Sequence, residues 1–63
     1  KYKDINLFLR YKFENAVVRI QTDGKNYVKF KGEQEFLAKE GSGIVQEARL
    51  GQDVITEEEY NNY

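Results

Sequence analysis

The 63-residue sequence contains no cysteine and no histidine. Without cysteine there is no disulfide, no thiolate metal site and no cysteine nucleophile. Without histidine the commonest metal ligand and general base are missing. A core this small also leaves little room for a pocket of the ~300 Å³ that a small-molecule site needs. We therefore expect a chain that is not an enzyme and binds no cofactor or metal.

Long apolar runs are also missing. No run approaches the roughly 18 residues that span a bilayer, and the first residues have no apolar segment typical of a signal peptide. We expect a cytoplasmic protein with no membrane partner. The length predicts a single domain over residues 1–63, and 40% apolar residues are enough for a folded chain with a small core.

The two halves of the chain carry opposite charge, although the net charge is only −1. Residues 1–32 have eight basic and three acidic side chains, a net charge of +5, and residues 33–63 have two and eight, a net charge of −6. The near-neutral total is therefore a cancellation between two regions. Opposite charges on one small chain also favour association of two copies, so a homodimer is among the expected partners.

The first half alternates like antiparallel strands. Residues 16–21 and 25–31 are rich in valine, isoleucine and aromatic residues, and Thr22-Asp23-Gly24 between them is a hairpin signal. A three-residue loop with Gly24 in the left-handed conformation puts apolar residues on one face. Its predicted pairs are Val18 with Val28 and Ala16 with Phe30. A third strand is predicted over residues 5–13, where Ile5, Leu7, Leu9, Tyr11 and Phe13 share one side.

We predict that a two-residue loop at Glu14-Asn15 connects the strand over residues 5–13 to the strand over residues 16–21. Asparagine tolerates the positive φ that such a loop needs. This loop keeps the apolar residues on the same face. The predicted pairs across it are Phe13 with Ala16, Tyr11 with Val18, and Leu9 with Ile20.

The second half predicts short helices. Residues 33–40 have acidic residues first, Lys39 late and Gly41 after them, as in a helix, although the segment is short and a fourth strand is the alternative. Ser42 is a candidate N-cap for a helix that stops at Gly51, although residues 44–50 also alternate like a strand.

The last predicted helix begins after Thr56, which forms a capping box with Glu59. The fold class is thus α+β: a three- to four-stranded antiparallel β-meander with one face covered by short C-terminal helices. The side chains expected to cover that face are Phe36, Leu37, Ile44, Val45, Leu50, Val54 and Ile55.

The predicted register leaves the opposite face of the sheet basic and aromatic. In this register Arg10 lies opposite Arg19, an unfavourable pair of like charges that an anionic partner would relieve. Cations that neutralise phosphates beside rings that stack on bases are typical of a nucleic-acid surface. The candidate binding residues are Phe8, Arg10, Lys12, Arg19, Lys25, Tyr27, Lys29 and Lys31.

Three interpretations of this face stay open at the level of sequence. The first is a small non-catalytic binding module that binds nucleic acid through the basic-aromatic face. The second is a small regulator or inhibitor of the phage or mobile-element type that binds another protein. The third is the ordinary solvated face of an antiparallel sheet, where lysine and arginine are common.

Overall fold

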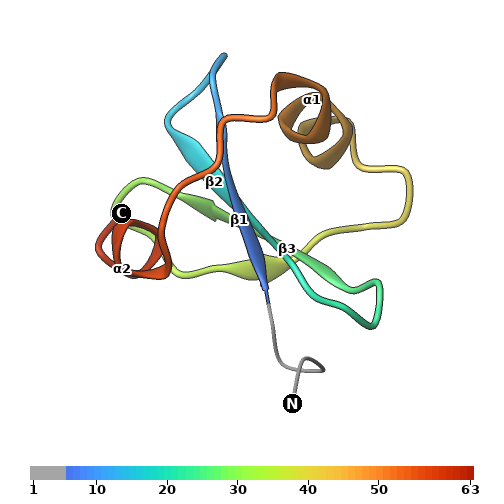
Figure 1. Cartoon of the computed structure of the whole chain (residues 1–63), viewed down its shortest axis with the longest axis horizontal. Helices are drawn as coiled ribbons and strands as arrows, with labels where there is room; N and C mark the ends of the chain where they lie inside the picture. The colour runs from blue at the N-terminus through green and yellow to red at the C-terminus, as the bar shows by residue number, and fades with distance from the viewer. Residues whose placement is uncertain (1–5) are drawn as a thin grey trace.

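A computed structural model describes residues 6–63 as a four-stranded antiparallel sheet followed by two short helices (Figure 1). The strands lie in the order β1-β2-β3-β4, so each strand pairs with the next one in the sequence. The predicted α+β meander is confirmed, and it has the fourth strand. In chain order the elements are β1 (Leu7–Tyr11), β2 (Ala16–Ile20), β3 (Asn26–Phe30), β4 (Phe36–Leu37), α1 (Gly43–Gly51) and α2 (Glu57–Asn61). Ile5, predicted to lie in the first strand, is outside the described residues.

The hairpin between β2 and β3 has the predicted loop and register. Gly24 has a φ of 93°, and its N–H donates to the carbonyl of Gln21 at 3.1 Å. Gln21 N–H in turn donates to the carbonyl of Lys25 at 2.9 Å, which closes the three-residue loop. Val18 pairs with Val28, as expected, and Ala16 with Phe30.

The register between β1 and β2 differs from the prediction by two residues. Leu9 pairs with Val18 rather than Ile20, and the loop is four residues long. Asn15 does not have the predicted positive φ, since Gln52 is the only non-glycine residue with one in the described part of the chain. A shift of two residues preserves the faces of the sheet, because side chains alternate with a period of two. The hydrophobic pattern therefore cannot distinguish the two registers.

This shift removes the predicted pair of like charges. Arg10 lies opposite Val17, and Arg19 lies opposite Phe8. The argument that repulsion between Arg10 and Arg19 indicates an anionic partner is therefore wrong.

The second half combines one short strand with two capped helices. The N-cap of α1 is Ser42, whose Oγ accepts from Val45 N–H at 3.4 Å, so the helix interpretation of this segment is confirmed. The N-cap of α2 is Thr56, and both hydrogen bonds of the predicted capping box with Glu59 are present. Residues 33–40 are not helical, and they contain β4.

The two helices pack on opposite faces of the sheet, as Figure 1 shows, whereas the sequence predicted that both cover one face. Each face therefore has its own hydrophobic cluster. The α1 face buries Leu9, Val18, Val28, Val45 and Ala48. The α2 face buries Phe8, Val17, Ile55 and Tyr60.

Several side chains predicted to cover the sheet are exposed instead. Leu50 is 79% exposed and Val54 is 62% exposed. Leu50 lies about 200° around the helix from Ala48 at the usual 100° per residue, so the helix that buries Ala48 turns Leu50 toward solvent. The edge-strand residues Phe36 and Leu37 are exposed as well.

Candidate functional site

The face predicted to be open for binding is the face that α2 covers. Phe8 is only 8% exposed, and its ring centroid lies 5.1 Å from that of Tyr60. Val17, beside it on the same face, is fully buried. The expectation of an open sheet face is therefore wrong, because these two apolar residues form a second core. Phe8 can stack on a base only if α2 moves away.

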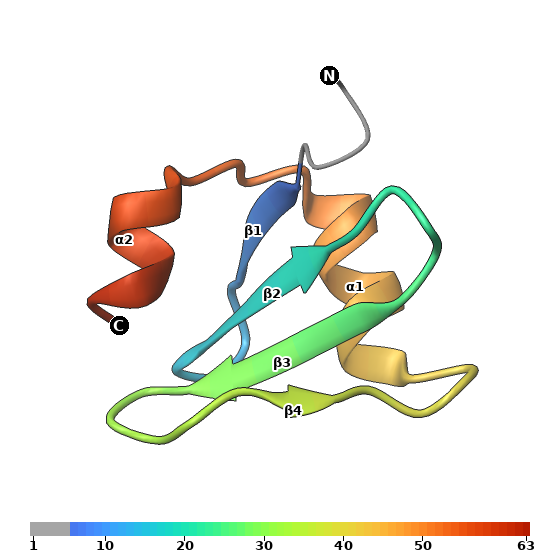
Figure 2. The same ribbon diagram turned by 90° about the horizontal axis from the view of Figure 1, so that it is seen from below.

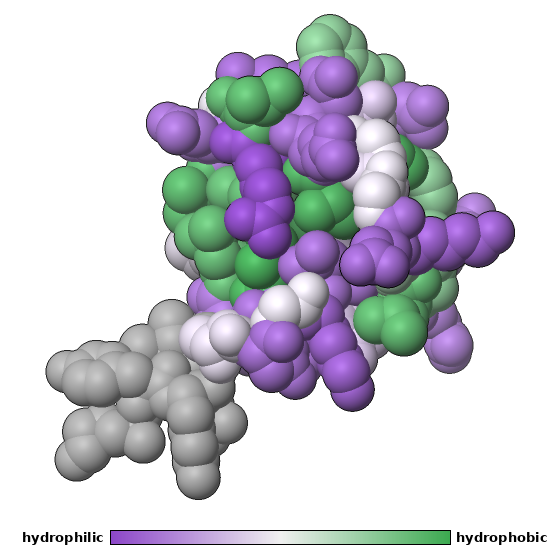
Figure 3. All heavy atoms as spheres, turned by 90° about the vertical axis from the view of Figure 1, so that its right-hand side faces the viewer, coloured by the Kyte–Doolittle hydropathy of each residue, from purple (hydrophilic) through white to green (hydrophobic). Residues whose placement is uncertain are grey.

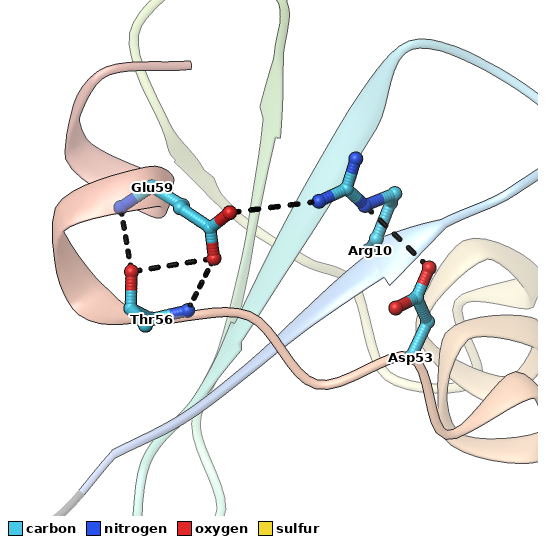
Figure 4. A network of polar contacts seen from close by, with 4 residues as sticks. All are labelled: Arg10, Asp53, Thr56 and Glu59. Carbon is cyan, nitrogen blue, oxygen red and sulfur yellow. Dashed lines mark hydrogen bonds and ion pairs between the residues drawn. The ribbon is translucent and has the colours of Figure 1, made fainter.

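Arg10 lies between α2 and the segment that leads into it (Figure 4). Its Nε is 3.5 Å from Asp53 Oδ2, and its Nη2 is 4.0 Å from Glu59 Oε2. Glu59 Oε1 also accepts from Thr56 N–H at 2.9 Å. This backbone hydrogen bond is the largest cause that lowers the pKa of Glu59. The positive charge of Arg10 is thus shared by two carboxylates of the same chain.

Arg19 belongs to a group of three polar side chains, with Glu35 and Tyr60, which we call the cleft network. Arg19 Nε and Nη2 donate to the two carboxylate oxygens of Glu35 at 3.2 and 2.8 Å. Tyr60 Oη donates to Oε1 of the same carboxylate. The Arg19 guanidinium also lies 4.2 Å from the ring centroid of Tyr27.

The contacts in the cleft network shift the pKa of each member. Burial alone raises the pKa of Glu35, but the hydrogen bonds from Arg19 and Tyr60 outweigh it, so the net pKa is lowered. The hydrogen bond to Glu35 raises the pKa of Arg19. Burial, followed by the hydrogen bond to Glu35, raises the pKa of Tyr60 well above its usual range. At neutral pH the network is therefore an ion pair with a neutral phenol as an additional donor.

Lys29 binds the C-terminal end of α2. Its Nζ donates to the carbonyl oxygens of Tyr60 at 3.1 Å and Asn61 at 2.9 Å. A cation at the carbonyl end of a helix is favourable, because the aligned peptide dipoles place partial negative charge there. Lys29 thus holds α2 against the sheet.

Phe8, Arg19 and Lys29 line one surface cleft of about 770 Å³ between α2, the sheet and the loop before β4. A core this small was expected to leave little room for a pocket, and this cleft lies at the surface rather than inside either hydrophobic cluster. The two cations of this cleft already bind groups of the same chain, namely the carboxylate of Glu35 and the carbonyls of α2. The arrangement attaches α2 and leaves little unsatisfied charge for a ligand.

The other three predicted cations have different surroundings from those of the cleft. Lys12 runs beside Gly51, where a Cβ atom would lie 3.9 Å from Lys12 Cε. Lys31 Nζ lies 5.9 Å from the ring centroid of Tyr63. Lys25 lines a different hollow, together with Lys39 and Arg49. None of the three predicted cations forms an ion pair with another residue in the range 6–63. The structure therefore does not gather the eight predicted residues into one surface.

Two exposed apolar side chains line one hollow where the β1–β2 loop lies beside the C-terminal end of α1. Phe13 is 74% exposed and Leu50 is 79% exposed, and both line a hollow of about 270 Å³. The ring of Tyr11 contacts that of Phe13 edge-on, with centroids 5.7 Å apart. We call this the Phe13–Leu50 surface. Its complete lining is Arg10, Lys12, Phe13, Glu47, Leu50 and Gly51.

Sequence reasoning missed the Phe13–Leu50 surface because it assigned both residues to the core. The helical spacing of Val45, Ala48 and Leu50 could have predicted that Leu50 is exposed. A short helix that buries Val45 and Ala48 turns Leu50 toward solvent. The view in Figure 3 shows hydrophobic residues exposed between hydrophilic ones over one side of the molecule.

A third hollow, of about 440 Å³, brings together cations from three segments. Lys25 comes from the β2–β3 loop, Lys39 from the segment after β4, and Arg49 from α1. Lys39 and Arg49 belong to the acidic half of the chain, and only folding places them beside Lys25. Glu40 is the only carboxylate in the lining. No ion pair involves any of these three cations within the described chain.

No family model, curated protein or solved structure shows significant similarity to this chain. Within residues 6–63, no helix combines the length and hydrophobicity that crossing a membrane requires. In the same part of the chain, no three acidic side chains are grouped so that they could hold a metal ion.

Proposed function

We propose that the chain is a small non-catalytic binding module and that a protein docks on its Phe13–Leu50 surface. The observation that carries this proposal is the convergence of two large apolar side chains, each about three-quarters exposed, in one hollow. Full burial of a leucine or phenylalanine side chain contributes about 1.5–3 kcal/mol. Aromatic side chains that fill a pocket at the centre of an interface are also typical of binding hot spots.

The side chains around the hollow indicate the chemistry of the partner. The amine of Lys12 has no ion pair within residues 6–63, whereas Arg10 is held by Asp53 and Glu59. Glu47, which also lines the hollow, has no ion pair within residues 6–63 either. The partner should therefore present an apolar side chain flanked by a carboxylate near Lys12 and a basic group near Glu47. Such charges at the rim of an interface increase the association rate and specificity more than the affinity. A cytoplasmic regulator or inhibitor that docks on another protein is the form of this function that we favour.

Site-specific photo-crosslinking tests this proposal. A benzophenone amino acid at position 13 should form a discrete adduct in extracts of the source cells, and the adduct should disappear when Leu50→Glu is added. The same group at Glu58, an exposed position on α2, is the control and should not form that adduct. If position 13 forms no adduct, or if Leu50→Glu leaves the adduct unchanged, the docking surface is refuted.

A second candidate function, nucleic-acid binding, is supported by the hollow that contains Lys25, Lys39 and Arg49. These three cations have no ion pair within residues 6–63. Cations around one groove are able to contact successive phosphates, and such contacts weaken strongly as salt rises. This version of the hypothesis does not use Phe8, because the ring is buried.

Fluorescence anisotropy with labelled single- and double-stranded oligonucleotides tests the second candidate, at about 50 and 200 mM salt. Binding that falls steeply with salt, is lost in Lys25→Glu and persists in Lys12→Glu would support it. These two lysines are matched because both are exposed loop residues without an ion pair in the described chain. The absence of binding at the lower salt concentration would exclude it.

A further inference from the structure

The two edges of the sheet differ in how they are protected. The β1 edge is covered by the segment before α2, because Arg10 N–H donates to Asp53 O at 2.8 Å and Ile55 N–H donates to Phe8 O at 2.9 Å. No ribbon lies beyond β4, which forms the rim of the sheet in Figure 2. An open edge strand is a template for another strand, and proteins usually protect it with charge, proline or a covering segment.

The open edge of this sheet is apolar. Phe36 is 47% exposed and Leu37 is 57% exposed, and these two residues make up β4. The ring of Phe36 stacks on Phe30, with centroids 6.0 Å apart and planes 24° apart. Phe36 is therefore held in place on the α1 face by its neighbour in β3, and its outer side is free to contact another chain.

The pairing with β3 determines which backbone groups of β4 point outward. Ala38 N–H donates to Asn26 O at 2.8 Å, so Ala38 is in a hydrogen-bonded pair. Hydrogen-bonded and non-hydrogen-bonded pairs alternate along an antiparallel ladder. Leu37, opposite Tyr27, is therefore in a non-hydrogen-bonded pair, and its N–H and C=O point away from β3. Glu35 has the same orientation, because it is two residues away.

The charges on either side of β4 are complementary to those of a second copy of the same segment. Glu33 precedes Phe36 by three residues and Lys39 follows it by three. Neither side chain forms an ion pair within residues 6–63. Glu33 lies in the turn that follows β3, because its N–H donates to Phe30 O at 2.9 Å. In an antiparallel pair centred on Phe36, its side chain therefore approaches Lys39 of the other copy at the end of the paired segment. Oppositely charged residues in such positions stabilise a strand pair.

We infer that a second copy of this chain adds to β4 as an antiparallel strand, with Phe36 opposite Phe36 and Glu33 near Lys39 of the other copy. The inference goes beyond the proposed function, because it concerns the β4 edge and not the Phe13–Leu50 surface. In this register Glu35 and Leu37 of the two copies exchange backbone hydrogen bonds, as their outward orientation requires. A twofold axis makes the same patch serve both copies.

The competing self-pairing, centred on Leu37, is less favourable. It places Glu35 opposite Lys39, but the carboxylate of Glu35 already binds Arg19 and Tyr60. Pairing centred on Phe36 instead uses Glu33 and Lys39, which form no ion pair within residues 6–63, and places two phenylalanine rings side by side. Aromatic pairs across strands are among the stabilising ones.

Sedimentation equilibrium of the full chain, with folding checked by circular dichroism, tests this register. Glu33→Lys and Lys39→Glu should each weaken the dimer about tenfold or more, because each variant puts like charges at both contact points. A mixture of the two variants should form a heterodimer, because both contact points then have opposite charges. In a chemically synthesised chain, N-methylation of Leu37 should abolish the dimer, since it removes an N–H that points outward.

Each other result overturns the inference. If the wild type dimerises but the charge variants and their mixture do so equally well, the register is wrong. If the dimer survives N-methylation of Leu37 and is lost in Leu50→Glu, the contact lies at the Phe13–Leu50 surface. If the wild type is a monomer at every concentration, β4 does not bind a second copy. The photo-crosslink from position 13 is unaffected in this last case, so failure of this inference and failure of the proposed function are distinguishable.

Discussion

Replacement of Phe8 by alanine should lower the free energy of unfolding by about 3 kcal/mol, because α2 buries this side chain. Phe8 is 8% exposed, its ring packs against that of Tyr60 with the planes tilted by 48°, and it belongs to one cluster with Val17 and Ile55. Truncation of a core phenylalanine to alanine usually costs about 3–5 kcal/mol. The lower value applies here, because the cluster is small and lies close to the surface, so it can relax around the cavity.

Urea denaturation followed by far-ultraviolet circular dichroism measures this effect. With a slope of about 1 kcal/mol per molar urea, the midpoint should fall by about 3 M. A chain of this length has a total stability of about 3–9 kcal/mol, so Phe8→Leu, with an expected loss of about 1 kcal/mol, is the milder variant. Phe13→Ala is the matched control, since this ring is 74% exposed and its removal should change stability by at most about 0.5 kcal/mol. Equal midpoints for Phe8→Ala, Phe13→Ala and the wild type would refute the packing of α2 on this face.

The remaining predictions concern the cleft network, a helix cap and two glycines. Although burial alone raises the pKa of Glu35, its two partners in the cleft network lower it below 4.5. The stability that this carboxylate contributes is therefore present above about pH 4.5 and is lost as the pH falls through the folded-state pKa. In urea titrations at several pH values, the Glu35→Gln variant should therefore lose less stability on acidification than the wild type. Thr56→Ala removes the capping box and should lower stability by about 1 kcal/mol, whereas Thr56→Ser should restore most of it; equal thermal midpoints for the two variants would contradict the cap. Gly24→Ala should destabilise the β2–β3 hairpin, because the φ of Gly24 is 93°. Gly43→Ala should stabilise the chain by about 0.4–1 kcal/mol in the same assay, because a Cβ atom at this position has no other atom within 4 Å.

The elements that sequence analysis predicted correctly depend on short-range interactions. Gly24 permits the left-handed residue of the β2–β3 loop, and the resulting register follows from the loop length. Ser42 and Thr56 satisfy N–H groups three residues further on, so the starts of both helices are visible in the sequence. The β1–β2 register was not accessible in this way, because shifts of two residues preserve the alternation.

The candidate site was predicted less well because it depends on which face each helix covers. The alternation correctly indicates that Phe8, Val17 and Arg19 share a face, but it does not indicate whether that face is covered. The adjacent apolar residues Phe8 and Val17 were the available signal of a second core among the basic residues. The Phe13–Leu50 surface was not predicted, since the β1–β2 loop and the end of α1 meet only in the folded chain.

By itself, the sequence determined the α+β meander, the β2–β3 hairpin and the caps of both helices, because each depends on residues a few positions apart. Only the tertiary structure decided that α2 crosses to the face opposite α1. This choice buries Phe8, pairs Arg19 with Glu35, and uses Lys29 to hold the end of α2. It depends on contacts between residues more than fifteen positions apart, for which the local pattern contains no preference. The same long-range packing leaves the Phe13–Leu50 surface and the β4 edge exposed to solvent.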